Sequence, residues 1–380
     1  MIPYGRQDIS EADIRAVVDV LRSDWLTQGP VVPAFERALA ERCGAQHAVA
    51  VNSGTSALHL ACLALDVGPG DLVWTSAITF VASANCARYC GADVDFVDID
   101  PKSYNMSVAA LAQKLEAARE AKRLPKVIIP VHLCGQPCEM AAIRALGERY
   151  GFRIIEDASH ALGARYRGEP VGSGEHSDIT VLSFHPVKII TSGEGGAALT
   201  GDARLAKRMQ NLRTHGITRD AADIAHPPDG AWYYEQQELG LNYRMTDLHA
   251  ALGMSQMVRL DEFLGARKRV AARYDERLAG LPVARPWQHH DAESAWHLYV
   301  VRVQKDHRAV FDQLRAAGIG VNLHYIPVYR QPYYARMGFD RAQFPEAERY
   351  YGEAISIPIF SQLTEAQQGE VVKGLKAAVS

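Results

Sequence analysis

Lys188 is the residue in this chain that is best placed to do covalent chemistry. It follows an apolar, strand-like run at residues 179–184 and precedes a glycine-rich turn at residues 193–196. Its neighbours Ile189 and Ile190 are apolar, so we expect the ammonium group to be poorly solvated, which lowers a lysine pKa. A partly neutral lysine can attack an aldehyde and form a Schiff base. Taken alone, such a lysine is more often a solvated surface residue, because lysine is rarely buried.

A carboxylate upstream strengthens the functional interpretation. Asp157 follows the apolar pair Ile154 and Ile155, which predicts a buried strand that ends at this residue. Ligands of open α/β sheets bind at such strand ends. Pyridoxal phosphate enzymes need a lysine for the aldehyde and an acid that keeps the pyridine nitrogen protonated. Lys188 and Asp157 are therefore the candidate catalytic pair, and pyridoxal 5'-phosphate is the expected cofactor.

A glycine and small hydroxyl residues occur where a helix is expected to begin. Ser53, Gly54 and Thr55 lie between a strand-like run at residues 48–51 and a helical pattern at residues 56–65. Free N–H groups and the helix dipole make such a start an anion site. In isolation the segment is more often an ordinary helix cap without a ligand. It lacks the Gly-x-Gly-x-x-Gly pattern, which counts against a nicotinamide cofactor.

Four segments, taken in order, resemble the DegT/DnrJ/EryC1/StrS family of sugar aminotransferases, and the similarity extends from Tyr4 to Pro358. They are Asn52-Ser53-Gly54-Thr55-Ser56-Ala57-Leu58, Glu156-Asp157-Ala158-Ser159-His160-Ala161, Ser183-Phe184-His185-Pro186-Val187-Lys188 and Gly240-Leu241-Asn242-Tyr243-Arg244-Met245. The resemblance implies the type I, aspartate aminotransferase-like fold of pyridoxal phosphate-dependent transferases. This is an α/β fold with a mostly parallel central sheet and a smaller C-terminal α+β domain.

The resemblance also implies roles around the cofactor. Phe80 would stack on the pyridine ring, and His160, where many relatives have glutamine, would contact the 3-oxygen. In a homodimer with shared active sites, Asn242 would reach the cofactor phosphate of the partner subunit. The implied cofactor-binding set is Thr55, Ser56, Phe80, Asp157, His160, Ser183, Lys188 and Asn242. Within this set the phosphate would be anchored by Thr55, Ser56, Ser183 and the partner subunit's Asn242.

For the substrate, the resemblance implies a second set of residues and a reaction. The set is Tyr4, Trp25, Leu26, Thr27, Arg244, His324 and Tyr325. Arg244 suits a nucleotide diphosphate, because a guanidinium group matches phosphate oxygens bidentately. The dehydratases of the family replace the lysine with histidine, so Lys188 favours transamination.

Residues 183–191, 26–30 and 324–325 are most similar to the pseudaminic-acid branch of the family. The resemblance then implies transfer of an amino group from glutamate to C4 of UDP-4-keto-6-deoxy-N-acetyl-β-L-altrosamine. The product would serve pseudaminic acid biosynthesis and flagellin glycosylation. Another UDP- or dTDP-linked keto-deoxysugar is the alternative substrate.

Two other classes of protein fit the sequence less well. A cysteine desulfurase or amino-acid aminotransferase shares the fold, but a desulfurase needs a mobile cysteine near the C-terminus, and the last cysteine here is Cys138. A non-catalytic regulator that binds cofactor or sugar would be expected to lack Lys188 or to carry a DNA-binding domain.

Bulk composition narrows the remaining choices. A length of 380 residues with 48% hydrophobic residues predicts two domains, which we place at 1–248 and 249–380. A net charge of −3 gives no basic excess for nucleic acid. Six dispersed cysteines without a Cys-x-x-Cys pair indicate a reducing, cytoplasmic setting. No apolar run reaches the ~18 residues of a membrane span.

Strand and helix patterns alternate along most of the chain, which predicts a mostly parallel sheet covered on both faces. Expected strands are residues 48–51, 72–75, 94–97, 127–131, 153–155, 179–184 and 196–199, then 297–303 and 320–323. Expected helices are residues 10–22, 56–65, 81–90, 108–121, 140–150, 202–213, 247–278, 307–317 and 365–378. Residues 289–291, His-His-Asp, are expected to form a solvated loop, and no metal site is predicted.

Overall fold

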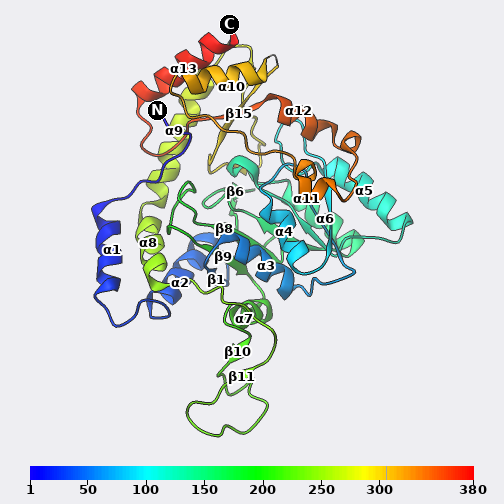
Figure 1. Ribbon diagram of the computed structural model, residues 1–380, viewed down its shortest axis with the longest axis vertical. Helices are drawn as coiled ribbons and strands as arrows, with labels where there is room; N and C mark the ends of the chain where they lie inside the picture. Colours follow the sequence, from blue (N-terminus) through cyan, green and yellow to red (C-terminus); the bar gives the residue numbers. More distant parts are fainter. Residues whose placement is uncertain (305) are drawn as a thin grey trace.

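A seven-stranded sheet forms the centre of the computed structural model, which describes residues 1–304 and 306–380 (Figure 1). In sheet order the strands are β1 (His47–Val51), β9 (Gly196–Thr200), β8 (Ile179–Ser183), β5 (Arg153–Asp157), β4 (Val127–Ile129), β2 (Leu72–Ser76) and β3 (Asp93–Val97). The pairs from β8 to β3 are parallel, and β9 runs antiparallel to both β8 and β1. The predicted α/β fold with a mostly parallel sheet is therefore confirmed.

Helices cover both faces of this sheet, because successive strand residues point to opposite sides. They are α3 (Gly54–Ala64), α4 (Ala82–Tyr89), α5 (Val108–Glu120), α6 (Met140–Tyr150) and α7 (Ala203–Leu212). Val73 and Ile155 pack in one core with α3, α4 and α7. Their neighbours Trp74 and Ile154 pack in another core with α5 and α6. Burial on both faces explains why these strands are apolar without alternation.

Helix α2 (Val31–Cys43) is an element that the sequence pattern did not reveal. Its N-cap, Pro30, provides no side-chain cap. Instead the carboxylate of Asp247 accepts the N–H groups of Val31 and Val32, at 3.2 and 3.1 Å. Asp247 is fully buried and opens helix α8 (Asp247–Val258). A cap supplied by a residue more than 200 positions away leaves no local start signal.

The predicted helical stretch 247–278 is two consecutive helices, α8 and α9 (Leu260–Arg277), which meet at Arg259. Helix α1 (Glu11–Leu21) lies beside α8 (Figure 1). Phe263, near the start of α9, packs in a core with residues of the large sheet. Val270 and Tyr274, further along the same helix, pack in a separate core. The domain boundary at 248/249 stays a prediction.

The separate core that contains Val270 and Tyr274 includes a three-stranded antiparallel sheet. Its strands are β12 (Val283–Ala284), β14 (Tyr299–Val303) and β15 (Ala354–Ile357). Helices α10 (His307–Ala316) and α13 (Glu365–Val379) contribute apolar side chains to this core. The predicted strand at 320–323 is wrong, because this segment makes only an isolated bridge from Asn322 to Ser356. Both chain termini lie at this end of the molecule (Figure 1).

Shorter elements complete the fold. They are β6 (Arg165–Tyr166), β7 (Glu169–Pro170), β10 (Ile217–Thr218), β11 (Glu235–Gln236), β13 (Ala292–Glu293), α11 (Pro332–Ala335), α12 (Pro345–Glu353) and the 3-10 turns η1 (Leu133–Gly135), η2 (Val328–Arg330) and η3 (Arg341–Gln343). The hairpin of β10 and β11 extends away from the main body (Figure 1). Within the part of the chain that the structure describes, no helix combines the length and apolar character needed to cross a bilayer.

Candidate active site

Four strand ends meet at one cavity of about 870 Å³. Strands β8, β5, β4 and β2 run parallel to one another. Strand β9 is antiparallel to both β1 and β8, so β1 runs in the same direction as β8. Their carboxyl ends therefore share one edge of the sheet. Ser53 follows β1, Phe80 follows β2, Asp157 ends β5 and Lys188 follows β8, and all four line the cavity.

Asp157 is a buried carboxylate with fixed orientation. Its Oδ2 accepts a hydrogen bond from the Ser83 hydroxyl at 2.6 Å, and its Oδ1 accepts from the Ser159 hydroxyl at 2.6 Å and the Ser159 N–H at 3.1 Å. The side chain is 5% exposed. Each carboxylate oxygen has two lone pairs, so capacity remains for a donor in the cavity. No sequence pattern indicated a role for Ser83, which lies inside α4.

Lys188 projects from a loop between β8 and β9. Its own N–H donates to the His185 carbonyl at 2.8 Å, and the following residues Ile189 and Ile190 are buried in the core. Burial lowers the pKa of Lys188 to about 8, and the negative charge of Asp157 opposes this shift. The amine is therefore much closer to its neutral, nucleophilic form at neutral pH than an exposed lysine. The side chain is half-buried at the cavity wall, and its poor solvation stays a prediction.

A second polar pair supports the end of β5. Glu156 points to the face of β5 opposite Asp157, and its Oε2 lies 2.7 Å from Nε2 of the buried His132. His132 Nδ1 accepts the Cys138 N–H at 3.1 Å. Burial would raise the pKa of Glu156, but the hydrogen bond from His132 holds this pKa below its ordinary value. The pair fixes the strand end that carries Asp157.

The start of α3 approaches the sheet very closely. A Cβ on Gly196 would lie 2.5 Å from the Ser53 carbonyl carbon, and a Cβ on Gly54 would lie 3.0 Å from the Ser183 Cβ. First-turn N–H groups have no intrahelical partner. Gly54 and Thr55, the first two residues of α3, line the cavity together with Ser183. The Ser56 hydroxyl donates to Asn52 Oδ1 at 2.6 Å, so its proton is already engaged.

Aromatic side chains also line the cavity. Phe80 is 55% exposed although it lines the cavity, and its ring centroid lies 6.0 Å from that of Tyr325. The Tyr325 hydroxyl lies 3.1 Å from His160 Nε2. Tyr4, from the N-terminal segment, packs against His324 with ring centroids 5.2 Å apart. A flat, apolar ligand ring would cover the exposed face of Phe80.

Three of the five histidines that line the cavity have lowered pKa values. Burial, then the positive charge of Lys188, lowers the pKa of His324 to about 3. His160 and His297 also have pKa values well below the ordinary range, mainly because of burial, and their ring centroids lie 4.3 Å apart. The Nδ1 atoms of both are buried without a partner among the described residues. His297 was missed as a site residue, because a histidine at a strand start carries no distinguishing pattern.

The structure brings ten of the predicted site residues to this cavity. They are Tyr4, Thr55, Ser56, Phe80, Asp157, His160, Ser183, Lys188, His324 and Tyr325. The other predicted residues, Trp25, Leu26, Thr27, Asn242 and Arg244, do not line the cavity of their own chain. The Asn52 side-chain amide donates to the Asn242 carbonyl at 3.5 Å, and the Arg244 backbone forms an isolated β-bridge with Val51. Both residues therefore lie near the end of β1.

These features fit pyridoxal 5'-phosphate. The cavity provides an amine of lowered pKa, a fixed carboxylate, an aromatic face, and helix N–H groups for a phosphate. His160 also lines the cavity, and its buried Nδ1 has no partner among the described residues. Asp157 and Lys188 face the same cavity, as the predicted chemistry requires.

His289, His290 and Asp291 form the one cluster of three possible metal ligands among the described residues. It does not line the cavity. His289 Nδ1 accepts the Asp291 N–H at 3.1 Å, which leaves the ring proton on Nε2. The Asp291 carboxylate pairs with Arg167 at 2.8 Å. These contacts satisfy the cluster without an ion.

The fold and this cavity define a pyridoxal phosphate-dependent aminotransferase. A profile of the DegT/DnrJ/EryC1/StrS aminotransferase family matches residues 7–376, and the chain belongs to that family of sugar aminotransferases. It is 38% identical over its whole length to the spore coat polysaccharide biosynthesis protein SpsC of Bacillus subtilis, and the match covers 97% of SpsC.

Solved structures of aminotransferases have the same fold as this chain. Spr1654 from Streptococcus pneumoniae, in its PMP form, has a TM-score of 0.91 at 32% identity, covering all of this chain and 99% of Spr1654. Helicobacter pylori PseC, an aminotransferase in pseudaminic acid biosynthesis, has a TM-score of 0.90 at 28% identity, covering all of this chain and 99% of PseC.

Proposed function

We propose that this enzyme transfers the amino group of glutamate to C4 of UDP-4-keto-6-deoxy-N-acetyl-β-L-altrosamine, in pseudaminic acid biosynthesis for flagellin glycosylation. The observation that carries the proposal is the convergence of Lys188 and Asp157 on a cavity that His324 and Tyr325 also line. The similarity of the whole chain to PseC supports this branch of the family.

In this proposal, Lys188 first holds the cofactor and then moves a proton at the reacting carbon as general base and acid. Asp157 keeps the pyridine nitrogen protonated, and its two serine partners hold the carboxylate in place for this task. Bound pyridoxal phosphate supplies the electron sink that makes the carbon acidic. Thr55, Ser183 and the α3 N–H groups anchor the phosphate.

The sugar enters beside Tyr4, His324 and Tyr325, which meet at the same side of the cavity. The Tyr4 main chain is fixed by the Ile359 N–H, which donates to its carbonyl at 3.0 Å. His324 Nδ1 lies 2.8 Å from the Ser356 hydroxyl, so its ring cannot rotate freely. Neutral imidazole and phenol groups suit hydroxyl and carbonyl groups of a sugar better than a second charge would.

We further propose a homodimer in which each subunit completes the other's site. The hairpin that carries β10 and β11 extends from the body (Figure 1). The segment between these two strands exposes Trp232 at 73%, and tryptophan is enriched in protein–protein interfaces. Asn242 and Arg244 lie at the base of the hairpin, outside their own cavity. In the dimer, Asn242 reaches the partner's cofactor phosphate, and Arg244, Trp25, Leu26 and Thr27 contact the nucleotide sugar.

Subunit mixing tests this arrangement. The Lys188→Ala and Asn242→Ala variants should each be inactive or nearly so as homodimers. A mixed dimer contains one site with both native residues if Asn242 acts across the interface, so unfolding and refolding the two variants together should restore activity. Activity that stays absent in verified mixed dimers would place Asn242 in the site of its own chain.

The substrate assignment has its own test. Purified enzyme with glutamate and the UDP-4-keto-altrose derivative should yield the 4-amino sugar, detected by mass spectrometry as replacement of the keto oxygen by an amino group. The same assay with dTDP- and other UDP-linked keto-deoxysugars serves as the comparison. A much higher kcat/KM for one of those sugars would overturn the pseudaminic assignment and retain the aminotransferase.

A second substrate class is favoured by a specific observation. SpsC, named for spore coat polysaccharide biosynthesis, is 38% identical, against 28% for PseC. We therefore keep another UDP- or dTDP-linked keto-deoxysugar, destined for a surface polysaccharide, as the alternative acceptor. The substrate comparison above separates the two.

A further inference from the structure

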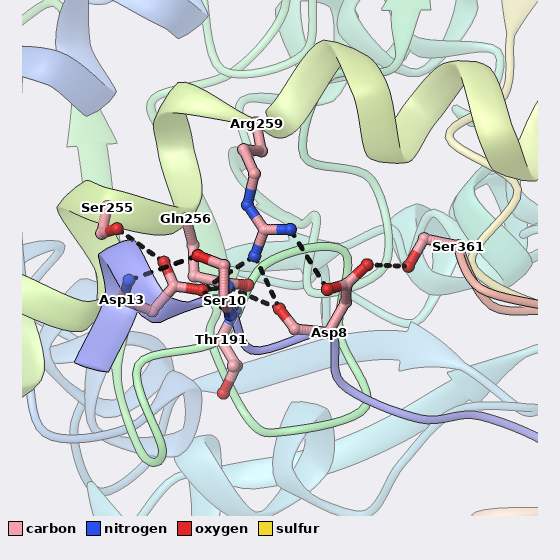
Figure 2. A network of polar contacts seen from close by, with 8 residues as sticks. All are labelled: Asp8, Ser10, Asp13, Thr191, Ser255, Gln256, Arg259 and Ser361. Carbon is pink, nitrogen blue, oxygen red and sulfur yellow. Dashed lines mark hydrogen bonds and ion pairs between the residues drawn. The ribbon is translucent and has the colours of Figure 1, made fainter. Parts of the chain in front are cut away.

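A buried polar network contacts the loop that follows Lys188, through Thr191 (Figure 2). It joins the N-terminal segment, the end of α8 and the loop that follows Lys188. Asp13 is fully buried and accepts hydrogen bonds from Ser255 at 2.6 Å and from Gln256 and Arg259 at 2.8 Å each. A buried carboxylate with this many donors is strongly held.

Gln256 connects the N-terminal segment, at Asp8 and Asp13, to the loop that follows Lys188, at Thr191. Its Nε2 donates to the Asp8 carbonyl and to Asp13 Oδ2, both at 2.8 Å. Two acceptors on one side fix the amide orientation, because a flipped amide would place its oxygen against the Asp13 carboxylate. Its Oε1 must then point toward the lysine loop, where it accepts the Thr191 N–H at 3.4 Å. The side chain is 2% exposed.

Thr191 closes the lysine loop on itself. Its hydroxyl donates to the Phe184 carbonyl at 3.1 Å and accepts the Gly193 N–H at 2.9 Å. The Ser192 N–H also donates to the Phe184 carbonyl, at 3.0 Å. The segment between Phe184 and Thr191, with Lys188 in it, is thus a tied loop. Gln256 attaches this loop to α8.

The network also holds Asp8, which lies four residues after the cavity residue Tyr4. Arg259 donates to the Asp8 carboxylate at 3.1 Å, and the Ser361 hydroxyl donates to the other Asp8 oxygen at 3.2 Å. Asp8 therefore fixes the segment whose upstream residue, Tyr4, lines the cavity. Neither Gln256 nor Arg259 lines that cavity, so any effect on the chemistry must pass through other residues.

We propose that Gln256 is a positioning residue for Lys188, acting through Thr191. The inference rests on the proposed catalytic role of Lys188. A displacement of about 1 Å in a reacting group can cost roughly 100-fold in rate, so a single amide that holds the loop has a measurable effect.

Two variants of Gln256 and one matched control test the proposal. Gln256→Met keeps the length of the side chain and removes its hydrogen bonds. Gln256→Glu places a carboxylate against Asp13. The control is Gln368→Met, because Gln368 is also a fully buried glutamine that joins two helices, with bonds of 2.8 Å to the Val270 carbonyl and 2.7 Å from Arg273, far from the lysine loop in sequence and outside the cavity.

For Gln256→Met we expect kcat to fall about 10-fold or more while KM for the sugar changes by less than about 3-fold. The pH midpoint of the visible absorption of the bound cofactor should shift, because Lys188 no longer sits in its native surroundings. In the cofactor-free protein, amide hydrogen exchange of the 184–193 peptide should accelerate. Gln368→Met should leave the midpoint and this peptide unchanged, whatever its effect on thermal stability.

Gln256→Glu gives an independent check if Gln256→Met folds poorly. Its kcat relative to the native enzyme should recover as pH falls, because a protonated glutamic acid can again donate to Asp13 and accept from Thr191. A flat ratio across pH would contradict the proposal. So would an unshifted absorption midpoint and unchanged exchange in both variants.

Borohydride reduction separates failure of the positioning role of Gln256 from failure of the proposed catalytic role of Lys188. Borohydride reduction of native holoenzyme should attach the cofactor covalently to Lys188. Absence of that attachment would remove the catalytic role of Lys188 itself. Attachment at Lys188, together with Gln256 variants that behave like the Gln368 control, would reject only the positioning role.

Discussion

Replacing Lys188 with alanine should lower kcat by about 1,000-fold, within the range for loss of a general acid–base group. The variant loses the only amine among the described residues that line the cavity, so no other side chain there can both hold the cofactor and move the proton. Steady-state transamination of the keto sugar with glutamate measures the effect. Binding of the sugar should change little, since Tyr4, His324 and Tyr325 remain in place.

Controls distinguish loss of chemistry from loss of fold. Lys207→Ala removes a lysine that pairs with Asp220 and Asp223 at the surface and should keep nearly full activity. Added small primary amines should restore part of the Lys188→Ala rate, because they can replace the missing base in the vacated space. Native-like activity in Lys188→Ala would reject the role given to this residue.

Replacing Asp157 with asparagine should lower kcat by roughly 100-fold or more, within the range of a lost electrostatic contact to the reacting system. Asparagine keeps the shape and can still accept one serine hydrogen bond, but it has no charge to hold a protonated pyridine nitrogen. Kinetics and the visible spectrum of the bound cofactor measure the change.

Ser83→Ala is the matched comparison for Asp157→Asn. It removes the 2.6 Å bond to Asp157 Oδ2 and leaves the carboxylate charged and held by Ser159. We expect only about a 10-fold decrease in kcat, in line with loss of one charge-assisted hydrogen bond. Equal losses for both variants would mean that placement of the carboxylate, and not its charge, is what matters.

Local patterns predicted much of the large sheet. The apolar runs at residues 153–155 and 179–184 predicted strands that the structure contains as β5 and β8, and the apolar neighbours of Lys188 predicted a residue that lines the cavity. These features succeed because each depends on consecutive residues. The resemblance then added Phe80, His160, His324 and Tyr325, which line the cavity but have no local pattern of their own.

Features that depend on distant partners escaped the sequence. Helix α2 is capped by Asp247, Asp157 is held by Ser83 from helix α4, and the His297 ring packs at a tilt against His160, 137 residues earlier in the chain. The wrongly predicted strand at 320–323 failed for a similar reason, since apolar content alone does not supply a pairing partner. Each of these contacts exists only after the chain has folded.

The most direct test of the account is to locate the cofactor linkage. Native enzyme would be reduced with borohydride in the presence of pyridoxal phosphate, digested, and mapped by tandem mass spectrometry. We expect the added mass on the peptide that contains Lys188, and its loss in Lys188→Ala. The added mass on another lysine, or none on a protein that still transaminates, would contradict it.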